Sequence, residues 1–150
     1  MLNGDQGALT AEEKLGFQTF VDSGCAMCHN GALLGGTSYQ RIGAAKPFPR
    51  AADPGRMAVT HAESDKATFK VPSLRNIEKT GPYLHDGSMA SLDDVVKLMA
   101  KHQLNKELKG PEVASIVTFL RALTGDLPAK AIAEPKLPAS GKDTPKPDPS

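Results

Sequence analysis

Apolar positions recur with a helical period in three stretches of the chain, and each stretch has its own start signal. Thr10 and Glu13 have the spacing of a capping box, so a first helix is predicted from there to about Val21. Gly16 lies four residues before Phe20 and would allow a second helix to cross closely, although a helix can also simply tolerate such a glycine. The apolar side of this helix comprises Leu15, Phe17, Phe20 and Val21.

Two further helices are predicted in the second half of the chain. Ser91 is a capping residue with acidic residues in the turn after it and lysines toward the helix end, which suits the helix dipole. Pro111 marks the start of the last helix and Gly125 its end. We expect this last helix to pack on the Gly16 face of the first. The apolar stripes are Leu92, Val95, Val96 and Met99 in one helix, and Val113, Ile116, Val117, Leu120 and Leu123 in the other.

The remaining segments show no sustained period. Residues 31–70 are rich in Gly, Pro and Ala, and so long a loop in a compact domain usually has a function or a ligand to surround. From Asp126 onward the chain holds six of its twelve prolines and no periodic apolar residues. We therefore predict one domain over residues 1–125 and an extended, Pro-rich tail over residues 126–150.

The chemistry of the chain is concentrated in residues 25–29, Cys-Ala-Met-Cys-His. Two cysteines separated by two residues and followed by a histidine are the attachment signature of c-type haem. The thiols of Cys25 and Cys28 can add to the two vinyl groups of the porphyrin, and His29 is then held on one face of the ring as the proximal ligand.

Two other chemistries use the same cysteine spacing. A zinc site would need two of His61, His85 and His102 to complete four ligands, and a second closely spaced ligand pair is missing. A thioredoxin-type disulfide would need a strand before the motif and a βαβ unit around it, which the local sequence does not offer. Covalent haem is therefore the favoured interpretation.

Composition agrees with a haem protein. The chain has 150 residues, with 39% hydrophobic and 5% aromatic side chains, which is little for a core built from side chains alone. A buried porphyrin would supply the missing apolar bulk. The 18 basic and 17 acidic residues nearly balance, so nothing favours a nucleic-acid or membrane partner, and no run approaches the length of a membrane span.

The haem motif also bears on location. Covalent haem attachment generally takes place outside the bacterial cytoplasm, which predicts a periplasmic protein. The residues at the start of the chain have neither the basic nor the apolar region of a signal peptide. We expect this start to be that of a mature or engineered chain.

Function depends on the ligand opposite His29. A histidine and methionine pair saturates the iron and leaves electron transfer, whereas an open position allows peroxide or oxygen to bind. The candidates are Met57, Met89 and Met99, with the three other histidines as the alternative. Loop context alone favours Met89. The helical period alone assigns Met99 to the core. Arg75 is a candidate partner for a haem propionate, or a solvated surface residue.

Four segments resemble one known family. They are Cys25 to Gly31, Phe69 to Asn76 (Phe-Lys-Val-Pro-Ser-Leu-Arg-Asn), Pro82 to Ser88 (Pro-Tyr-Leu-His-Asp-Gly-Ser) and Ile116 to Gly125. In this succession the chain resembles the C-terminal half of bacterial di-haem cytochrome c peroxidases and their methylamine-utilisation relatives. The resemblance covers roughly residues 9 to 150, and the Pro-Tyr-Leu-His-Asp-Gly-Ser block is more specific than the haem motif.

The resemblance implies a fold and a set of ligands. The fold would be all-α and class I cytochrome c-like, with about three to five helices around one covalent haem. The distal ligand of the family lies fourteen residues after the histidine of the His-Asp-Gly triplet, which is Met99 here and not Met89. A calcium ion would be bound by the backbone carbonyls of Thr80 and Pro82, with a further ligand supplied by an N-terminal domain.

The resemblance also implies a function. The corresponding domain is the electron-entry, high-potential haem, which takes electrons from a small cytochrome or cupredoxin and passes them to a peroxidatic haem domain. This chain has one haem motif and no tryptophan, whereas the full peroxidases have a second motif. We therefore expect an electron-transfer domain. The alternative is a single-haem peroxidase assisted by His85 or a glutamate. An apolar face left exposed by a missing domain would favour a homodimer.

Overall fold

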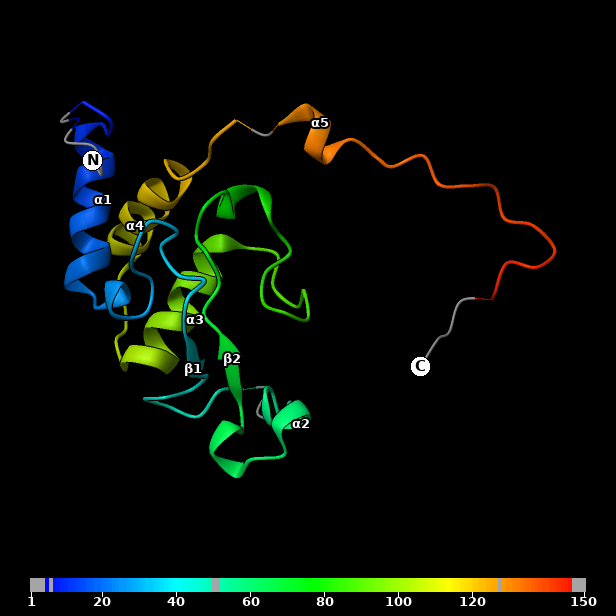
Figure 1. The fold of residues 1–150 in the computed structure, drawn as a ribbon. Coiled ribbons are helices and arrows are strands. Elements are labelled where there is room, and N and C mark those ends of the chain that lie inside the picture. Colours follow the sequence, from blue (N-terminus) through cyan, green and yellow to red (C-terminus); the bar gives the residue numbers. More distant parts are fainter. Residues whose placement is uncertain (1–4, 6, 50–51, 127, 147–150) are drawn as a thin grey trace.

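Three helices of about three turns form the body of the protein. The computed structural model describes residues 5, 7–49, 52–126 and 128–146. The helices are α1 (Ala11–Asp22), α3 (Leu92–Leu104) and α4 (Gly110–Arg121), and α1 and α4 lie side by side (Figure 1). They occupy the three stretches that the apolar period predicts, so the mostly helical fold is confirmed.

The predicted start signals are present as hydrogen bonds. Glu13 N donates to Thr10 Oγ1 at 3.2 Å, and Thr10 N donates to Glu13 Oε2 at 2.8 Å, which completes the capping box of α1. Asp94 N donates to Ser91 Oγ at 3.3 Å at the start of α3. Each cap satisfies backbone donors that the first turn of a helix cannot satisfy internally.

The core forms where α1 crosses α4. Gly16 is buried at this crossing, where a β-carbon would overlap the carbonyl oxygen of Ser115 and lie 2.9 Å from Phe119 Cβ. The rings of Phe20 and Phe119 pack with centroids 5.4 Å apart. The glycine therefore sets the close approach of the two helices, as its position before Phe20 suggested. The buried cluster is Phe20, Leu74, Ile116, Phe119, Leu120 and Leu123.

A small sheet in the long connecting segment corrects the all-α expectation. Strands β1 (Tyr39–Arg41) and β2 (Thr68–Lys70) pair antiparallel, with Gln40 opposite Phe69. Three residues a strand are too few to show a period of two, so the sequence pattern could not reveal them. The same segment contains the one-turn helix α2 (Met57–Thr60) and the 3₁₀ turn η2 (Glu63–Asp65).

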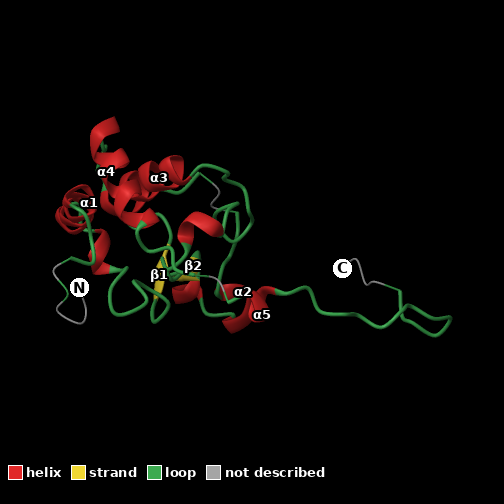
Figure 2. Ribbon diagram, turned by 90° about the horizontal axis from the view of Figure 1, so that it is seen from above, coloured by secondary structure: helices red, strands yellow, loops and turns green. Residues whose placement is uncertain are grey.

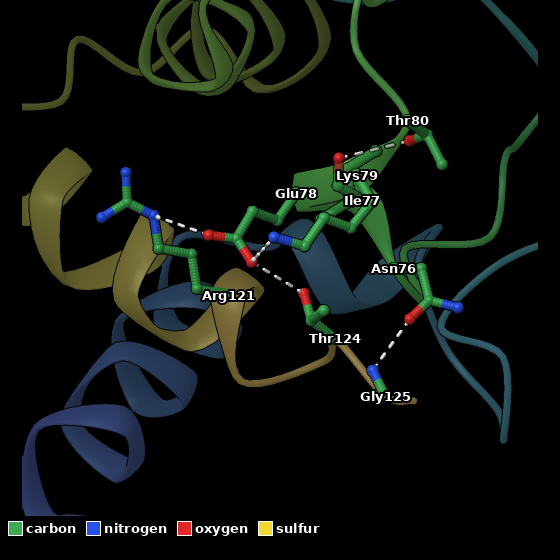
Figure 3. Close-up of polar contacts among 8 residues, drawn as sticks. All are labelled: Asn76, Ile77, Glu78, Lys79, Thr80, Arg121, Thr124 and Gly125. Carbon is green, nitrogen blue, oxygen red and sulfur yellow. Dashed lines mark hydrogen bonds and ion pairs between the residues drawn. The ribbon is translucent and has the colours of Figure 1, made fainter. Parts of the chain in front are cut away.

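A polar network ties the end of α4 to the 3₁₀ turn η3 (Ile77–Lys79), as Figure 3 shows. Gly125 N donates to Asn76 Oδ1 at 2.8 Å, and Thr124 Oγ1 donates to Glu78 Oε2 at 3.1 Å. Glu78 also pairs with Arg121, with 3.8 Å between Nε and Oε1. The network joins the segment before Pro82 to the helical core.

The C-terminal segment runs away from this body in both views (Figures 1 and 2). Its described residues 128–146 contain the four-residue helix α5 (Ala129–Ile132), which the prediction of an extended tail did not include. Ile132 and Leu137 are 61% and 80% exposed. None of the helices in the described residues is both long enough and apolar enough to cross a membrane.

Candidate cofactor cleft

One cleft gathers residues from three separate parts of the chain. The haem motif and the residue before it form one side, the sheet and the segment after β2 form another, and α3 contributes a third. The atom-free space in the cleft and at its mouth, open solvent included, is about 640 Å³. Its lining is Gly24, Cys25, Cys28, His29, Gln40, Ile42, Phe69, Lys70, Val71, Pro72, Met99, Gln103 and Leu104.

The turn after α1 brings both cysteines into the cleft. Gly24 has φ of 94°, a left-handed conformation that glycine adopts without strain, and it opens the 3₁₀ turn η1 (Cys25–Met27). His29 N donates to Cys25 O at 3.0 Å, which closes the turn around the motif. The two thiols and the imidazole are therefore presented from one short, hydrogen-bonded segment.

A backbone carbonyl holds the His29 ring. The Nδ1 atom of His29 lies 3.2 Å from Leu34 O, which accepts a hydrogen bond from it. Burial lowers the pKa of His29, and interactions with the Leu34 and Pro72 carbonyls oppose the shift without reversing it. The ring is therefore neutral near pH 7. Since carbonyls accept only from N–H, the proton is assigned to Nδ1, and Nε2 keeps the lone pair that a metal needs.

The cysteines lack the features of the two competing chemistries. Burial raises the pKa of Cys25 to about 11, whereas redox-active thiols have a lowered pKa. No βαβ unit surrounds the motif, since η1 follows a helix. Among the described residues, no group of three or more histidine, cysteine and acidic side chains could hold a metal ion. The described residues therefore give no support to the zinc or the disulfide interpretation.

Among the candidate methionines, Met99 is the one that lines the cleft. It lies on α3, half-buried, and lines the cleft together with the haem motif. Met89 is engaged elsewhere, since its backbone pairs with that of Tyr83, with 2.6 Å from Tyr83 N to Met89 O. Met57 begins α2, outside the cleft lining. Of the three candidates, Met99 is thus the one that shares the cleft with His29, and its ligation of a haem iron stays a prediction.

The other candidate histidines lie outside the cleft lining. His102 is 8% exposed and packs edge-on against Phe48, with ring centroids 5.5 Å apart. His85 Nε2 lies 2.6 Å from Asp53 Oδ2. His61 caps the end of α2 in a left-handed conformation. None of the three is placed to share the cleft with His29.

Arg75, Thr80 and Pro82 are the remaining predicted site residues. Arg75 is absent from the cleft lining; its Nε and Nη2 donate to Ala32 O at 3.0 and 2.9 Å, which ties the loop after the motif to the segment after β2. Thr80 Oγ1 donates to Ile77 O at 3.2 Å, and the Gly81–Pro82 peptide is cis. Binding of a propionate by Arg75 and of calcium by the two carbonyls stays a prediction.

Sequence reasoning missed the polar side chain beside Met99. Gln103 lies one turn after Met99 and lines the cleft, and its Oε1 accepts a hydrogen bond from Gly43 N at 2.5 Å. Its Nε2 donates to Arg41 O at 3.1 Å, which braces α3 against β1. The i, i+4 spacing from Met99 is the signal that could have identified it.

Comparisons with known proteins identify relatives of this chain, although no family model matches it. It is 49% identical over 152 residues to cytochrome c551 peroxidase of Nitrosomonas europaea, covering 99% of this chain and 44% of the relative. It is 44% identical to cytochrome c551 peroxidase of Pseudomonas aeruginosa, covering 97% and 43%. It is 34% identical to the methylamine utilization protein MauG of Methylorubrum extorquens, covering 90% and 40%.

A solved structure gives the same result. The crystal structure of a MauG-like protein associated with microbial copper homeostasis superposes with a TM-score of 0.67 at 25% identity, over 82% of this chain and 46% of that one. The chain thus spans less than half the length of the curated relatives named above. Over most of its own length, it is homologous to the bacterial cytochrome c peroxidase and MauG family.

Proposed function

We propose that this chain is an electron-transfer domain built around one covalent c-type haem with His29 and Met99 as axial ligands. One observation carries the proposal: Cys25, Cys28, His29 and Met99, which the sequence places up to 74 residues apart, line a single cleft. Homology to cytochrome c peroxidases over most of the chain supports it.

The residues of the cleft fit such a group. Cys25 and Cys28 would bind it covalently, a neutral His29 would hold the iron from one side, and the Met99 thioether would complete the coordination. The apolar side chains of Ile42, Phe69, Val71 and Leu104 would exclude water from the ring. The haem itself supplies a reversible one-electron couple, and a histidine and methionine pair raises its potential. The protein's part is to bind, orient and desolvate it.

The partners follow from the family. The chain would correspond to the C-terminal, electron-entry half of the relatives and would act in the periplasm. A small cytochrome or cupredoxin would donate one electron at a time, and a peroxidatic haem domain would accept it. Thr80 and Pro82 would supply the backbone carbonyls of an incomplete calcium site beside that domain.

The structure gives little support to a peroxidase centre within this chain. Cleavage of peroxide requires a group that moves a proton beside the open position. None of the described residues lining the cleft is acidic, and His85 lies outside that lining, paired with Asp53. Peroxide turnover by the isolated chain at rates comparable to a two-haem enzyme would contradict the proposal.

The optical spectrum tests the assignment of Met99. The ferric protein should show the weak long-wavelength charge-transfer band that sulfur ligation gives to low-spin iron. Met99→Ala should lose this band, and Met89→Ala, a matched change outside the cleft lining, should keep it. Loss of the band in Met89→Ala alone would transfer the assignment to Met89. A high-spin spectrum of the unmodified protein would show an open sixth position and overturn electron transfer as the sole function.

A further inference from the structure

Two loops that are distant in the sequence flank His29. Residues 31–36 follow the haem motif, and residues 71–74 follow β2. Gly36 N donates to Val71 O at 2.8 Å, and Leu74 N approaches Leu34 O at 3.3 Å. Ser73 Oγ donates to Leu33 O at 2.8 Å. These bonds bring the Leu34 and Pro72 carbonyls together at the ring of His29.

Gly35 lies at the point of closest approach between the two loops. It is buried and has φ of 121°, a conformation that side chains with a β-carbon rarely adopt. A β-carbon at Gly35 would overlap the Pro72 carbonyl oxygen, lie 3.0 Å from the carbonyl carbon and lie 3.2 Å from His29 Nδ1. Backbone atoms cannot rotate aside as a flexible side chain can. Any larger residue would therefore have to move residues 31–36 relative to the Pro72 carbonyl and the imidazole.

We propose that Gly35 is a positioning residue for the proximal histidine, which lets residues 31–36 pack directly against Pro72, keeps the Leu34 carbonyl hydrogen-bonded to the His29 ring and so lowers the reduction potential of the iron. The inference rests on the proposed function, because it takes His29 to be the ligand. A carbonyl that accepts from Nδ1–H makes the imidazole a stronger donor through Nε2 and stabilises ferric iron. Displacing the carbonyl removes part of that stabilisation.

Two neighbouring glycines provide matched controls. Gly31 and Gly36 also have positive φ, of 73° and 85°, so an alanine there meets the same kind of backbone strain. A β-carbon at Gly31 would meet nothing within 4 Å, and one at Gly36 would meet only Leu33 Cδ1 at 3.8 Å. Only the variant at Gly35 adds contact with the Pro72 carbonyl and His29.

The test is the reduction potential of the haem-loaded variants. Gly35→Ala should shift the equilibrium toward ferrous iron by about tenfold, the lower end of outer-shell effects at metal sites, which corresponds to about 59 mV for one electron. Gly31→Ala and Gly36→Ala should stay near the unmodified value. Equal potentials in Gly35→Ala and Gly36→Ala would overturn the inference, and general destabilisation would not by itself produce the difference.

A second measurement decides the matter if Gly35→Ala does not fold. In the ferrous unmodified protein, the His29 Nδ1 proton should exchange slowly with water and give a nuclear Overhauser contact to a Gly35 α proton. Rapid exchange without that contact would overturn the inference. A mass spectrum without covalent haem would instead overturn the proposed function, whereas bound haem with Met99 ligation and unaltered potentials would overturn the role of Gly35 alone.

Discussion

Single residues outside the cleft connect its wall to the protein surface. Phe69 lines the cleft and stacks on His85, with ring centroids 4.7 Å apart. His85 in turn pairs with Asp53, whose Oδ1 accepts a hydrogen bond from Gly55 N at 2.7 Å. The Gly55 hydrogen bond, aided by His85, lowers the pKa of Asp53. The ionised carboxylate therefore favours the folded state.

This carboxylate predicts a pH-dependent contribution to stability. Because the folded pKa lies below the ordinary value of 3.8, the contribution is complete above pH 3.8 and is lost as the pH falls through the folded value. Asp53→Asn should lower the free energy of unfolding in urea at pH 7 by a small amount, about 1 kcal/mol or less for so exposed a pair. The deficit should shrink at pH 3.

Asp143→Asn, an equal charge change in the exposed tail, is the control for this measurement. It should leave the urea midpoint unchanged at both pH values. A deficit in Asp53→Asn that persists undiminished at pH 3 would show that the charge of the carboxylate is not the cause.

At the scale of elements, the crossing of α1 and α4 supports the haem motif. The motif begins three residues after α1 ends, and the ring of Phe20 on α1 lies 6.5 Å from that of His29. Phe20 is fixed in turn by Phe119 on α4. A shift of α1 relative to α4 would therefore move the motif as well as the core.

Gly16→Ala should be destabilising for this reason. The added β-carbon would overlap the Ser115 carbonyl oxygen, and overpacking of this kind costs about 1–3 kcal/mol, more than the roughly 1 kcal/mol that alanine gains in helix propensity. Gly110→Ala, where a β-carbon meets nothing within 4 Å, should leave the free energy of unfolding unchanged or raise it slightly. Equal unfolding free energies for the two variants would contradict the close crossing.

The helices and the haem motif could be predicted because their signals are local. A capping box, an apolar period or a pair of cysteines is complete within a few turns of chain, as the Thr10 and Glu13 pair shows. The sheet could not, because each strand has three residues, and the role of Gly35 depends on Pro72, 37 positions away. Met99 shows where local signals fail. Its spacing along the helix is that of a core residue, and only the family resemblance indicated a ligand.

At the scale of the whole molecule, the body and the tail differ in how they are held. Gly125 is fastened to Asn76, and Leu123 is buried in the core. Beyond this point, residues 126, 128–130 and 132–146 are all exposed. The apolar side chains of Ile132 and Leu137 therefore add little to the stability of this chain by itself.

Truncation after Asp126 should consequently leave the protein folded and haem-loaded, with the free energy of unfolding changed by no more than about 0.5 kcal/mol. Truncation after Ala122 is the contrasting variant, since it removes the buried Leu123 and the Gly125 hydrogen bond. Thermal unfolding of both truncated proteins is the measurement, and the truncation after Ala122 should lower the stability clearly. Similar losses in both truncations would mean that the tail packs on the body.

The central claim is that one iron is held by His29 and Met99 in the cleft, and X-ray absorption at the iron edge tests it most directly. The ferric protein should show one sulfur in the first coordination shell of the iron together with nitrogen ligands only. Met99→Ala should lose that sulfur, and Met89→Ala should retain it. An iron shell without sulfur in the unmodified protein, or one that is unaltered by Met99→Ala, would contradict the account.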